Sequence, residues 1–308
     1  MTIPAAASMS RTIRSHGRYR YSAIVDRPDF DWPEGRRLAV YIGLNLEHFD
    51  FGQGYGAALA SGRREPDVLN YSWRDYGNRV GAWRLLELFE SLKLPVGLIV
   101  NSSIADYCPE LVTAYRARLD TELIAHGRTN SESQNEFDEA GEAALIAESR
   151  DRLTAAFGEA PQGWLGPWIA QSEITPDLLA EAGFGYHLDW CHDDQPTWMA
   201  TRDGGRILSV PYPQEINDIP SIVAHHIDYR EFAARIVDQF DEMHEQSRAQ
   251  LLVMGIALHP YIVGQPFRLR ALRRALTHVA SVRGDVWLTT PGAIARHFAR
   301  MKQAARSC

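Results

Sequence analysis

Short runs of apolar residues alternate with longer amphipathic segments along most of the chain. Most of the apolar runs are continuous, which is typical of strands that are covered on both faces, as in a parallel sheet. The runs that predict strands are residues 38–44, 95–100, 122–125, 163–165, 184–188, 207–210, 251–258 and 285–288. The segments that predict helices are residues 79–92, 109–117, 138–157, 175–182, 229–245, 266–280 and 291–301.

This succession of strands and helices predicts an α/β architecture, with a barrel as the expected arrangement. The chain has no internal repeat and no low-complexity linker. We therefore expect one catalytic domain over residues 21–308, preceded by an N-terminal arm over residues 1–20. Residues 49–73 and 189–228 show neither pattern and predict long loops, which are often functional in compact domains.

Composition narrows the class of protein. Of the 308 residues, 45% are hydrophobic, and the formal net charge of −7 argues against nucleic acid or an anionic membrane as the main partner. Three cysteines without the spacing of a thiolate zinc site indicate a reducing compartment. No apolar run is long enough to span a membrane, and the N-terminal residues lack the order of a secretory signal. We therefore expect a cytoplasmic protein.

Several predicted strands end in polar or aromatic residues. In a parallel α/β barrel the carboxyl ends of the strands meet at one rim, where catalysis takes place. A single histidine there is more often structural, but carboxylates and imidazoles from several strands at one rim favour a functional site. These strand-end residues are Asn45, Glu47, His48, His126, Asp189, Trp190 and His259.

This set of side chains suits hydrolysis of an amide-type C–N bond. Catalytic zinc sites use histidine nitrogens and carboxylate oxygens and keep one position open for water, so His48 and His126 with an oxygen ligand would form such a site. Glu47 would take the proton from water, and His259 would donate a proton to the leaving nitrogen or stabilise the oxyanion. Asp189 would orient a basic partner.

Other chemistries have weaker support. The chain has no GxGxxG sequence that opens a helix after the first strand, no Walker loop and no GxSxG elbow. Cys191 has no basic neighbour in sequence, which argues against a nucleophilic thiol. Four further histidines are interpreted as structural or solvated: His225, His226, His278 and His297.

The chain resembles the polysaccharide deacetylase-like (NodB-homology) superfamily over about residues 18–300, and more closely its branch of allantoinase-type and cyclic-imide hydrolases. Six segments together carry the resemblance: DWPEGRRLAVYIGLNLEHFD, YGNRVGAWRLLELFE, HGRTNS, GYHLDWCHDDQPTW, VPYPQEINDI and ALHPYIVGQPFR. The resemblance implies a distorted (β/α) barrel of about seven strands.

The resemblance also implies roles for individual residues. Glu47 occupies the position of the family's catalytic base, and His48 stands where the family places a metal-binding carboxylate. His126 matches the first metal-binding histidine of an His-x-x-x-His motif whose second histidine is Asn130 here. Asp189 begins the Asp-Trp motif, and His259 stands at the position of the acid.

These departures from the family motifs, with a missing arginine before Pro167, favour a small cyclic amide, imide or ureide over a sugar polymer. The implied cofactor is a divalent metal, with zinc first, held by His48, His126 and Asn130, although a metal-independent enzyme is equally compatible. Arg128 would then supply positive charge by clamping a substrate carboxylate or carbonyl. By analogy with the family, we expect a homo-oligomer that acts on a small molecule.

The candidate substrate-binding residues are Asn45, Arg128, Trp168, Trp190, Asp194 and Asn217. For two pairs, Asp193-Asp194 and Asn217-Asp218, turn formation is the alternative to substrate contact. Tyr261 is expected to line the pocket. Two other functions stay open: an N- or O-deacetylase of an acetylated sugar or small molecule, and a catalytically lapsed barrel that binds a small ligand.

Overall fold

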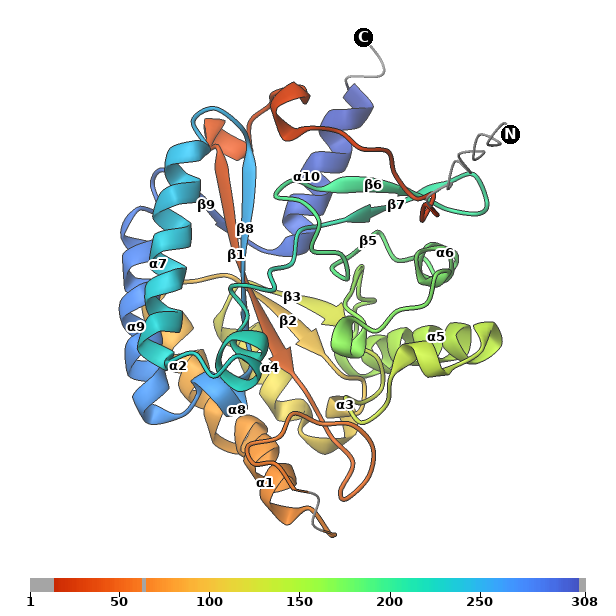
Figure 1. Ribbon diagram of the computed structural model, residues 1–308, viewed down its shortest axis with the longest axis vertical. Helices are drawn as coiled ribbons and strands as arrows, with labels where there is room; N and C mark the ends of the chain where they lie inside the picture. The colour runs from red at the N-terminus through yellow and green to blue at the C-terminus, as the bar shows by residue number, and fades with distance from the viewer. Residues whose placement is uncertain (1–13, 63–64, 305–308) are drawn as a thin grey trace, which may run out of the picture.

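The computed structural model describes residues 14–62 and 65–304, with side chains up to residue 301. A twisted sheet forms its centre, and most of the helices cover the outside of that sheet (Figure 1). Residues 1–13 of the predicted N-terminal arm lie outside the described residues. Residues 14–20 contain neither a helix nor a strand.

The sheet has nine strands in the order β6-β7-β5-β4-β3-β2-β1-β8, with β9 paired to β1. Every pairing is parallel except that of β6 with β7. The strands are β1 (Leu38–Leu46), β2 (Val96–Val100), β3 (Thr121–Ala125), β4 (Gly163–Trp164), β5 (Tyr186–His187), β6 (Thr197–Ala200), β7 (Arg206–Ser209), β8 (Leu252–Leu258) and β9 (Trp287–Thr289).

Helices α2, α7 and α9 lie together along one side of the sheet, and α5 and α6 lie at the other end (Figure 1). The helices are α1 (Val68–Tyr76), α2 (Ala82–Leu92), α3 (Ile104–Tyr107), α4 (Pro109–Arg118), α5 (Glu139–Phe157), α6 (Thr175–Glu181), α7 (Tyr229–Gln246), α8 (Pro260–Val263), α9 (Pro266–Ser281) and α10 (Pro291–Ala304). Among the described residues, no helix is long and apolar enough to cross a membrane.

The predicted α/β fold is confirmed, and each predicted strand and helix has a counterpart within a few residues. The two predicted loops were only partly right. Residues 189–228 contain β6, β7 and the short π-helix Ile219–Ala224, and residues 49–73 contain the start of α1. Local side-chain caps explain where some helices begin: Asp67 accepts the Asn70 N–H at α1, and Asp138 accepts the Gly141 N–H at α5.

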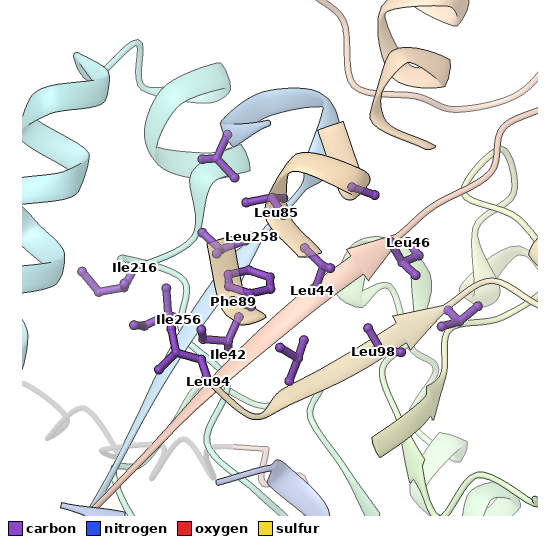
Figure 2. Close-up of a cluster of buried hydrophobic side chains, with 14 of the residues drawn as sticks. Ile42, Leu44, Leu46, Leu85, Phe89, Leu94, Leu98, Ile216, Ile256 and Leu258 are labelled. Atoms are coloured by element: carbon purple, nitrogen blue, oxygen red, sulfur yellow. The ribbon is translucent and has the colours of Figure 1, made fainter. Parts of the chain in front are cut away.

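The side chains of β1 alternate between two cores, although all nine residues are buried. Even-numbered residues such as Ile42 and Leu44 pack outward against the helices, where Figure 2 shows them close to Phe89 of α2. Odd-numbered residues such as Ala39 and Tyr41 belong to a second core inside the curve of the sheet. The same alternation continues past the end of the strand and decides where the polar residues point.

The curved sheet approaches closure between the segment after β7 and β8. The Ala257 N–H of β8 donates to the Ile216 carbonyl at 3.0 Å, and an isolated parallel bridge pairs Asn217 with Ala257. Nearer the other end of the sheet, the Tyr41 hydroxyl donates to the Pro211 carbonyl. Residues 210–218 therefore run beside β8 and carry polar side chains to its carboxyl end.

Candidate active site

Three strand ends deliver their polar side chains to one pocket. Glu47 follows β1, His126 follows β3 and His259 follows β8, and each continues the inward-facing set of its strand. All three are at least nine-tenths buried, and they line a pocket with a cavity volume of about 110 Å³. These three residues therefore meet at one rim of the sheet, as the positions of the strand ends predicted.

Both carboxylate oxygens of Glu47 accept hydrogen bonds from neighbouring side chains. Its Oε1 accepts a hydrogen bond from Asn130 Nδ2 at 2.6 Å, and its Oε2 accepts one from the Tyr261 hydroxyl at 3.0 Å. The Glu47 carbonyl accepts from Asn78 Nδ2 at 2.7 Å. These bonds fix a carboxylate that has almost no contact with solvent. Each oxygen of the Glu47 carboxyl group accepts a hydrogen bond from a neighbouring donor. An ionised carboxylate, which can only accept, fits this arrangement.

His259 is held by Asp218. The Asp218 Oδ1 lies 2.6 Å from Nδ1 of the ring, and Oδ2 accepts the His259 backbone N–H at 2.8 Å. Because a carboxylate can only accept, Nδ1 carries a proton. The other ring nitrogen, Nε2, lies 3.4 Å from Glu47 Oε1. His259 is therefore placed between two buried carboxylates.

The charges of this cluster favour one protonation state. Burial alone would raise the pKa of Glu47, but the attraction of the nearby His259 and His126 rings lowers it to about 2. Burial alone would lower the pKa of His259, but the charges of Asp218 and Glu47 raise it to about 10. Near neutral pH the pocket thus holds an ionised glutamate beside a protonated histidine.

His126 presents a free nitrogen to the same place. Its Nδ1 donates to the Leu165 carbonyl at 2.6 Å, so the ring is held from the β4 side. Its Nε2 is buried, has no hydrogen-bond partner among the residues that the structure describes, and lies 3.6 Å from Glu47 Oε1. An unpaired buried acceptor in a pocket marks a place where a ligand atom binds.

His48 lies outside this pocket, contrary to the predicted metal site. Because Glu47 points inward, the next residue points outward. The His48 ring stacks on Tyr107 at 4.4 Å between centroids, and its Nδ1 lies 3.0 Å from the Ser103 hydroxyl oxygen. Burial lowers the pKa of His48. The structure therefore does not bring His48 and His126 together as two imidazole ligands.

The donor set does not fit the zinc site that the resemblance implied. Asn130 turns its amide nitrogen toward Glu47, while its Oδ1 accepts from Asn101 Nδ2 at 2.9 Å. The geometry places a proton on Nδ1 of His259, and the charges of Asp218 and Glu47 raise its pKa to about 10, so Nε2 also carries a proton near neutral pH. His126 and Glu47 are left, whereas catalytic zinc is held by three protein ligands. No group of three or more His, Cys, Asp and Glu side chains in the described part of the chain is arranged for a metal.

Arg128 does not reach the pocket either. Its guanidinium pairs with Glu132 at 2.8 Å and with Glu148 of α5 at 2.9 Å. Gly127 carries the preceding backbone through φ +61°, and a Cβ there would come within 2.7 Å of Pro167. This left-handed glycine turns the chain away after His126, so the predicted anion clamp becomes a surface ion-pair group.

Two further predicted substrate contacts lie elsewhere. Trp190 packs edge-on against Tyr19, with ring centroids 5.8 Å apart, beside the N-terminal segment. Asp194 lines a different hollow with Cys191, and its carbonyl accepts the Val253 N–H. Neither residue is among those that line the pocket of Glu47 in the described part of the chain.

Asp189 supports the pocket from behind. Its Oδ1 accepts the Gly166 N–H at 2.6 Å, and burial raises its pKa to about 7. Its nearest basic neighbour is His187, with Nδ1 at 3.9 Å from Asp189 Oδ2. The structure thus places Asp189 beneath the turn that carries Trp168, without a hydrogen bond to His259 in the described part of the chain.

The remaining predicted substrate-binding residues do line the pocket: Asn45, Trp168 and Asn217. Trp168 has φ +61°, a strained conformation for a bulky residue, and its indole N–H donates to the Asn130 carbonyl at 3.1 Å. Asn45 donates to the Tyr212 hydroxyl at 3.0 Å. The turn of Trp168 therefore forms a wall beside the residue that holds Glu47.

Sequence reasoning missed the partners of the central residues. Asp218 was assigned to substrate contact or a turn, whereas it orients His259. Asn101 and Asn78 were missed as well, although Asn101 directly follows the apolar run 95–100. Tyr261 was expected at the pocket, and it binds Glu47. Tyr261 lies only two positions after His259, and this spacing could have suggested that its side chain also faces the end of β8.

The chain is similar to proteins of one superfamily. No family model matches it. A Schizosaccharomyces pombe protein named for polysaccharide deacetylation is 26% identical over 242 residues, which are 72% of this chain and 73% of that protein. The crystal structure of a probable polysaccharide deacetylase from Pseudomonas aeruginosa PAO1 has a TM-score of 0.80 and 27% identity, over 91% of this chain and 98% of that one. PuuE allantoinase gives a TM-score of 0.78 and 27% identity, with the same coverage.

These similarities and the sheet order assign the described residues an α/β fold with a mostly parallel sheet, which matches that of the deacetylase and allantoinase neighbours. The comparisons confirm the predicted resemblance to the polysaccharide deacetylase-like superfamily. Both a protein named as a deacetylase and an allantoinase are among its structural neighbours.

Proposed function

We propose that this chain is a hydrolase of a C–N bond other than a peptide bond, in a small cyclic amide, imide or ureide. One observation carries the proposal: Glu47 and His259 form a buried pair, 3.4 Å apart, at the carboxyl ends of β1 and β8. An ionised carboxylate accepts a proton and a protonated imidazole donates one, and amide hydrolysis needs both transfers.

The reaction follows from these two groups. A water molecule attacks the substrate carbonyl carbon, and Glu47 takes a proton from it as the new C–O bond forms. The C–N bond then breaks while the Nε2 proton of His259 passes to the leaving nitrogen. The products are a carboxyl group and an N–H group, which belongs to an amine for an amide substrate, to an amide for an imide and to a urea for a ureide. Transfer of a proton from Glu47 to His259, across 3.4 Å, restores the starting state.

The size and walls of the pocket support a small substrate. Its cavity volume of about 110 Å³ is below the usual range for drug-sized ligands, so it suits only a small substrate. Asn45, Trp168 and Asn217 offer amide groups and a flat ring, which suit a planar ring with carbonyl and N–H groups. Similarity to an allantoinase over 91% of this chain also favours a cyclic ureide.

Deacetylation of an acetylated sugar or small molecule is the second candidate. The similarity to proteins named as deacetylases favours it, and the same two proton transfers would cleave an acetamide. A lapsed ligand-binding barrel fits less well, because binding alone does not require an oriented carboxylate–imidazole pair.

A substrate panel tests these candidates. Purified protein, with and without added zinc, is incubated with allantoin, hydantoin, succinimide, phthalimide and N-acetylglucosamine oligomers. We expect ring opening of at least one cyclic compound and none of it with Glu47→Gln. Activity on the sugar oligomers alone would overturn the proposed substrate class. A thermal shift without turnover of any compound would favour the lapsed barrel.

A further inference from the structure

Asn101 connects the ends of three neighbouring strands. It follows β2 directly and is completely buried. Its Oδ1 accepts the His48 N–H at 2.8 Å, beyond the end of β1. Its Nδ2 donates to Asn130 Oδ1 at 2.9 Å and also to the His126 carbonyl, both beyond the end of β3.

The backbone decides which way the Asn101 amide faces. A backbone N–H can only donate, so the side-chain oxygen must face His48. A backbone carbonyl can only accept, so the side-chain nitrogen must face His126. Exchanging the oxygen and nitrogen of Asn101 would break both bonds inside a buried site, which is costly. The orientation of this amide is therefore determined by groups that cannot change their roles.

This orientation is transmitted to the next amide. Since Asn101 offers an N–H, Asn130 must present its oxygen to it. The nitrogen of Asn130 is then left for Glu47, where Nδ2 donates to Oε1 at 2.6 Å. Oε1 is the same oxygen that lies 3.4 Å from His259 Nε2 and 3.6 Å from His126 Nε2. The Asn130 bond therefore sets the direction in which Glu47 presents a lone pair to the pocket.

We propose that Asn101 is a positioning residue for the hydrolytic reaction, which fixes the Asn130 amide so that its N–H faces Glu47. The role of Asn101 rests on the proposed function of Glu47 as the base. Asn101 touches neither substrate nor water in this scheme and acts only through Asn130. The sequence gives no sign of this role, because Asn101 lies 53 positions from His48 and 29 from Asn130.

Asn101→Asp tests the inference with little change of shape. The carboxylate still accepts the His48 N–H, but an oxygen now faces the Asn130 oxygen. Asn130 must turn its amide, which presents an oxygen to Glu47 in place of an N–H. We expect kcat to fall at least about tenfold, with KM within about twofold, because substrate contacts are unchanged.

A double-mutant cycle separates positioning from a general loss of structure. Asn130→Ala removes the link between Asn101 and Glu47, so Asn101→Asp should have little further effect on kcat in that background. Asn70→Asp is the control, because Asn70 is also buried and bonds the Leu59 N–H and Asp67, away from the pocket. We expect that change to lower the melting temperature and leave kcat unchanged.

A spectroscopic measurement keeps the test independent of turnover. In ¹⁵N-labelled protein, the side-chain amide resonance of Asn130 should move in Asn101→Asp and stay in Asn70→Asp. An unchanged resonance, or additive kcat losses in the double mutant, would overturn the role of Asn101. A resonance that moves in a protein without hydrolase activity would support the orientation and refute the proposed function instead.

Discussion

Asp218 binds His259 through both of its carboxylate oxygens, one on the ring nitrogen at 2.6 Å and one on the backbone N–H at 2.8 Å. The two contacts define the position of the imidazole as well as its protonation. The opposite ring nitrogen is thereby directed toward Glu47. Asp218 reaches this place because the segment after β7 runs beside β8.

Asp218→Asn should shift the alkaline limit of activity to lower pH. His259 acts in its protonated form, and its pKa is raised to about 10, so activity should persist at neutral pH and fall as pH rises through about 10. Loss of the Asp218 charge lowers the pKa of His259, so activity should begin to decline at a lower pH. The pH profile of kcat/KM measures the shift. Asp189→Asn, whose carboxylate bonds Gly166, should leave the limit in place; equal shifts in both variants would contradict the assignment.

Glu47→Gln should lower kcat by about 10² to 10⁴, the usual effect of losing a general base. The amide keeps the size of the side chain, so folding should be retained. Glu122→Gln is the control: Glu122 is another buried carboxylate, but it bonds Gly292 and Tyr186 near the start of β3. Steady-state kinetics measure kcat of both variants, and circular dichroism spectra that match those of the unmodified protein show that the variants are folded. If Glu47→Gln kept its activity, Glu47 would lose the role of base.

The two histidines once assigned to one metal site should respond differently to replacement. His48→Phe preserves a flat ring against Tyr107, so kcat and KM should each stay within about twofold. His126→Phe removes the free nitrogen in the pocket and should abolish most turnover. Assays of both variants with one substrate make the comparison. A severe loss in His48→Phe alone would restore His48 to the functional site.

Chelation should not inactivate the enzyme. His126 and Glu47 provide fewer than the three protein ligands that a catalytic zinc site uses. Dialysis against a strong chelator, followed by elemental analysis and assay, should leave turnover unchanged. Loss of activity that returns on addition of zinc would refute this expectation and show that ligands rearrange around a metal.

Arg128→Ala should leave KM unchanged, because its guanidinium pairs with Glu132 and Glu148 instead of facing the pocket. The side chain is about one-third exposed, and pairs of this kind contribute about 0 to 1 kcal/mol each to the free energy of unfolding. Denaturant titration measures that loss. A large rise in KM with little change in stability would instead favour the clamp predicted from sequence.

Much of the fold could be predicted from local patterns. Continuous apolar runs indicated buried strands, and eight of the nine strands were expected close to their observed ends. β6 was missed because Thr197–Ala200 is short and lies at the edge of the sheet, where one antiparallel partner is enough. Its sequence lacks the apolar run that marks a strand covered on both faces.

Prediction of the site was more uneven. Glu47, His126 and His259 were expected at one rim because parallel strands end at the same edge, and the structure brings them together. It was harder to predict which side chains at a strand end point into the pocket. Residues 38–44 of β1 contain no charged or amide side chain, so the sequence shows little alternation that would tell which of Glu47 and His48 faces inward.

The sequence by itself determined the kinds of elements, their order and the residues that stand at the strand ends, because these depend on local hydrophobic patterns. The tertiary structure alone decided which of those residues meet. Pairing of residue 217 with 257 brings Asp218 to His259, and the inward face of β1 selects Glu47 over His48. Such choices depend on the curvature and register of the sheet, which join positions far apart in the chain and leave no local trace in it.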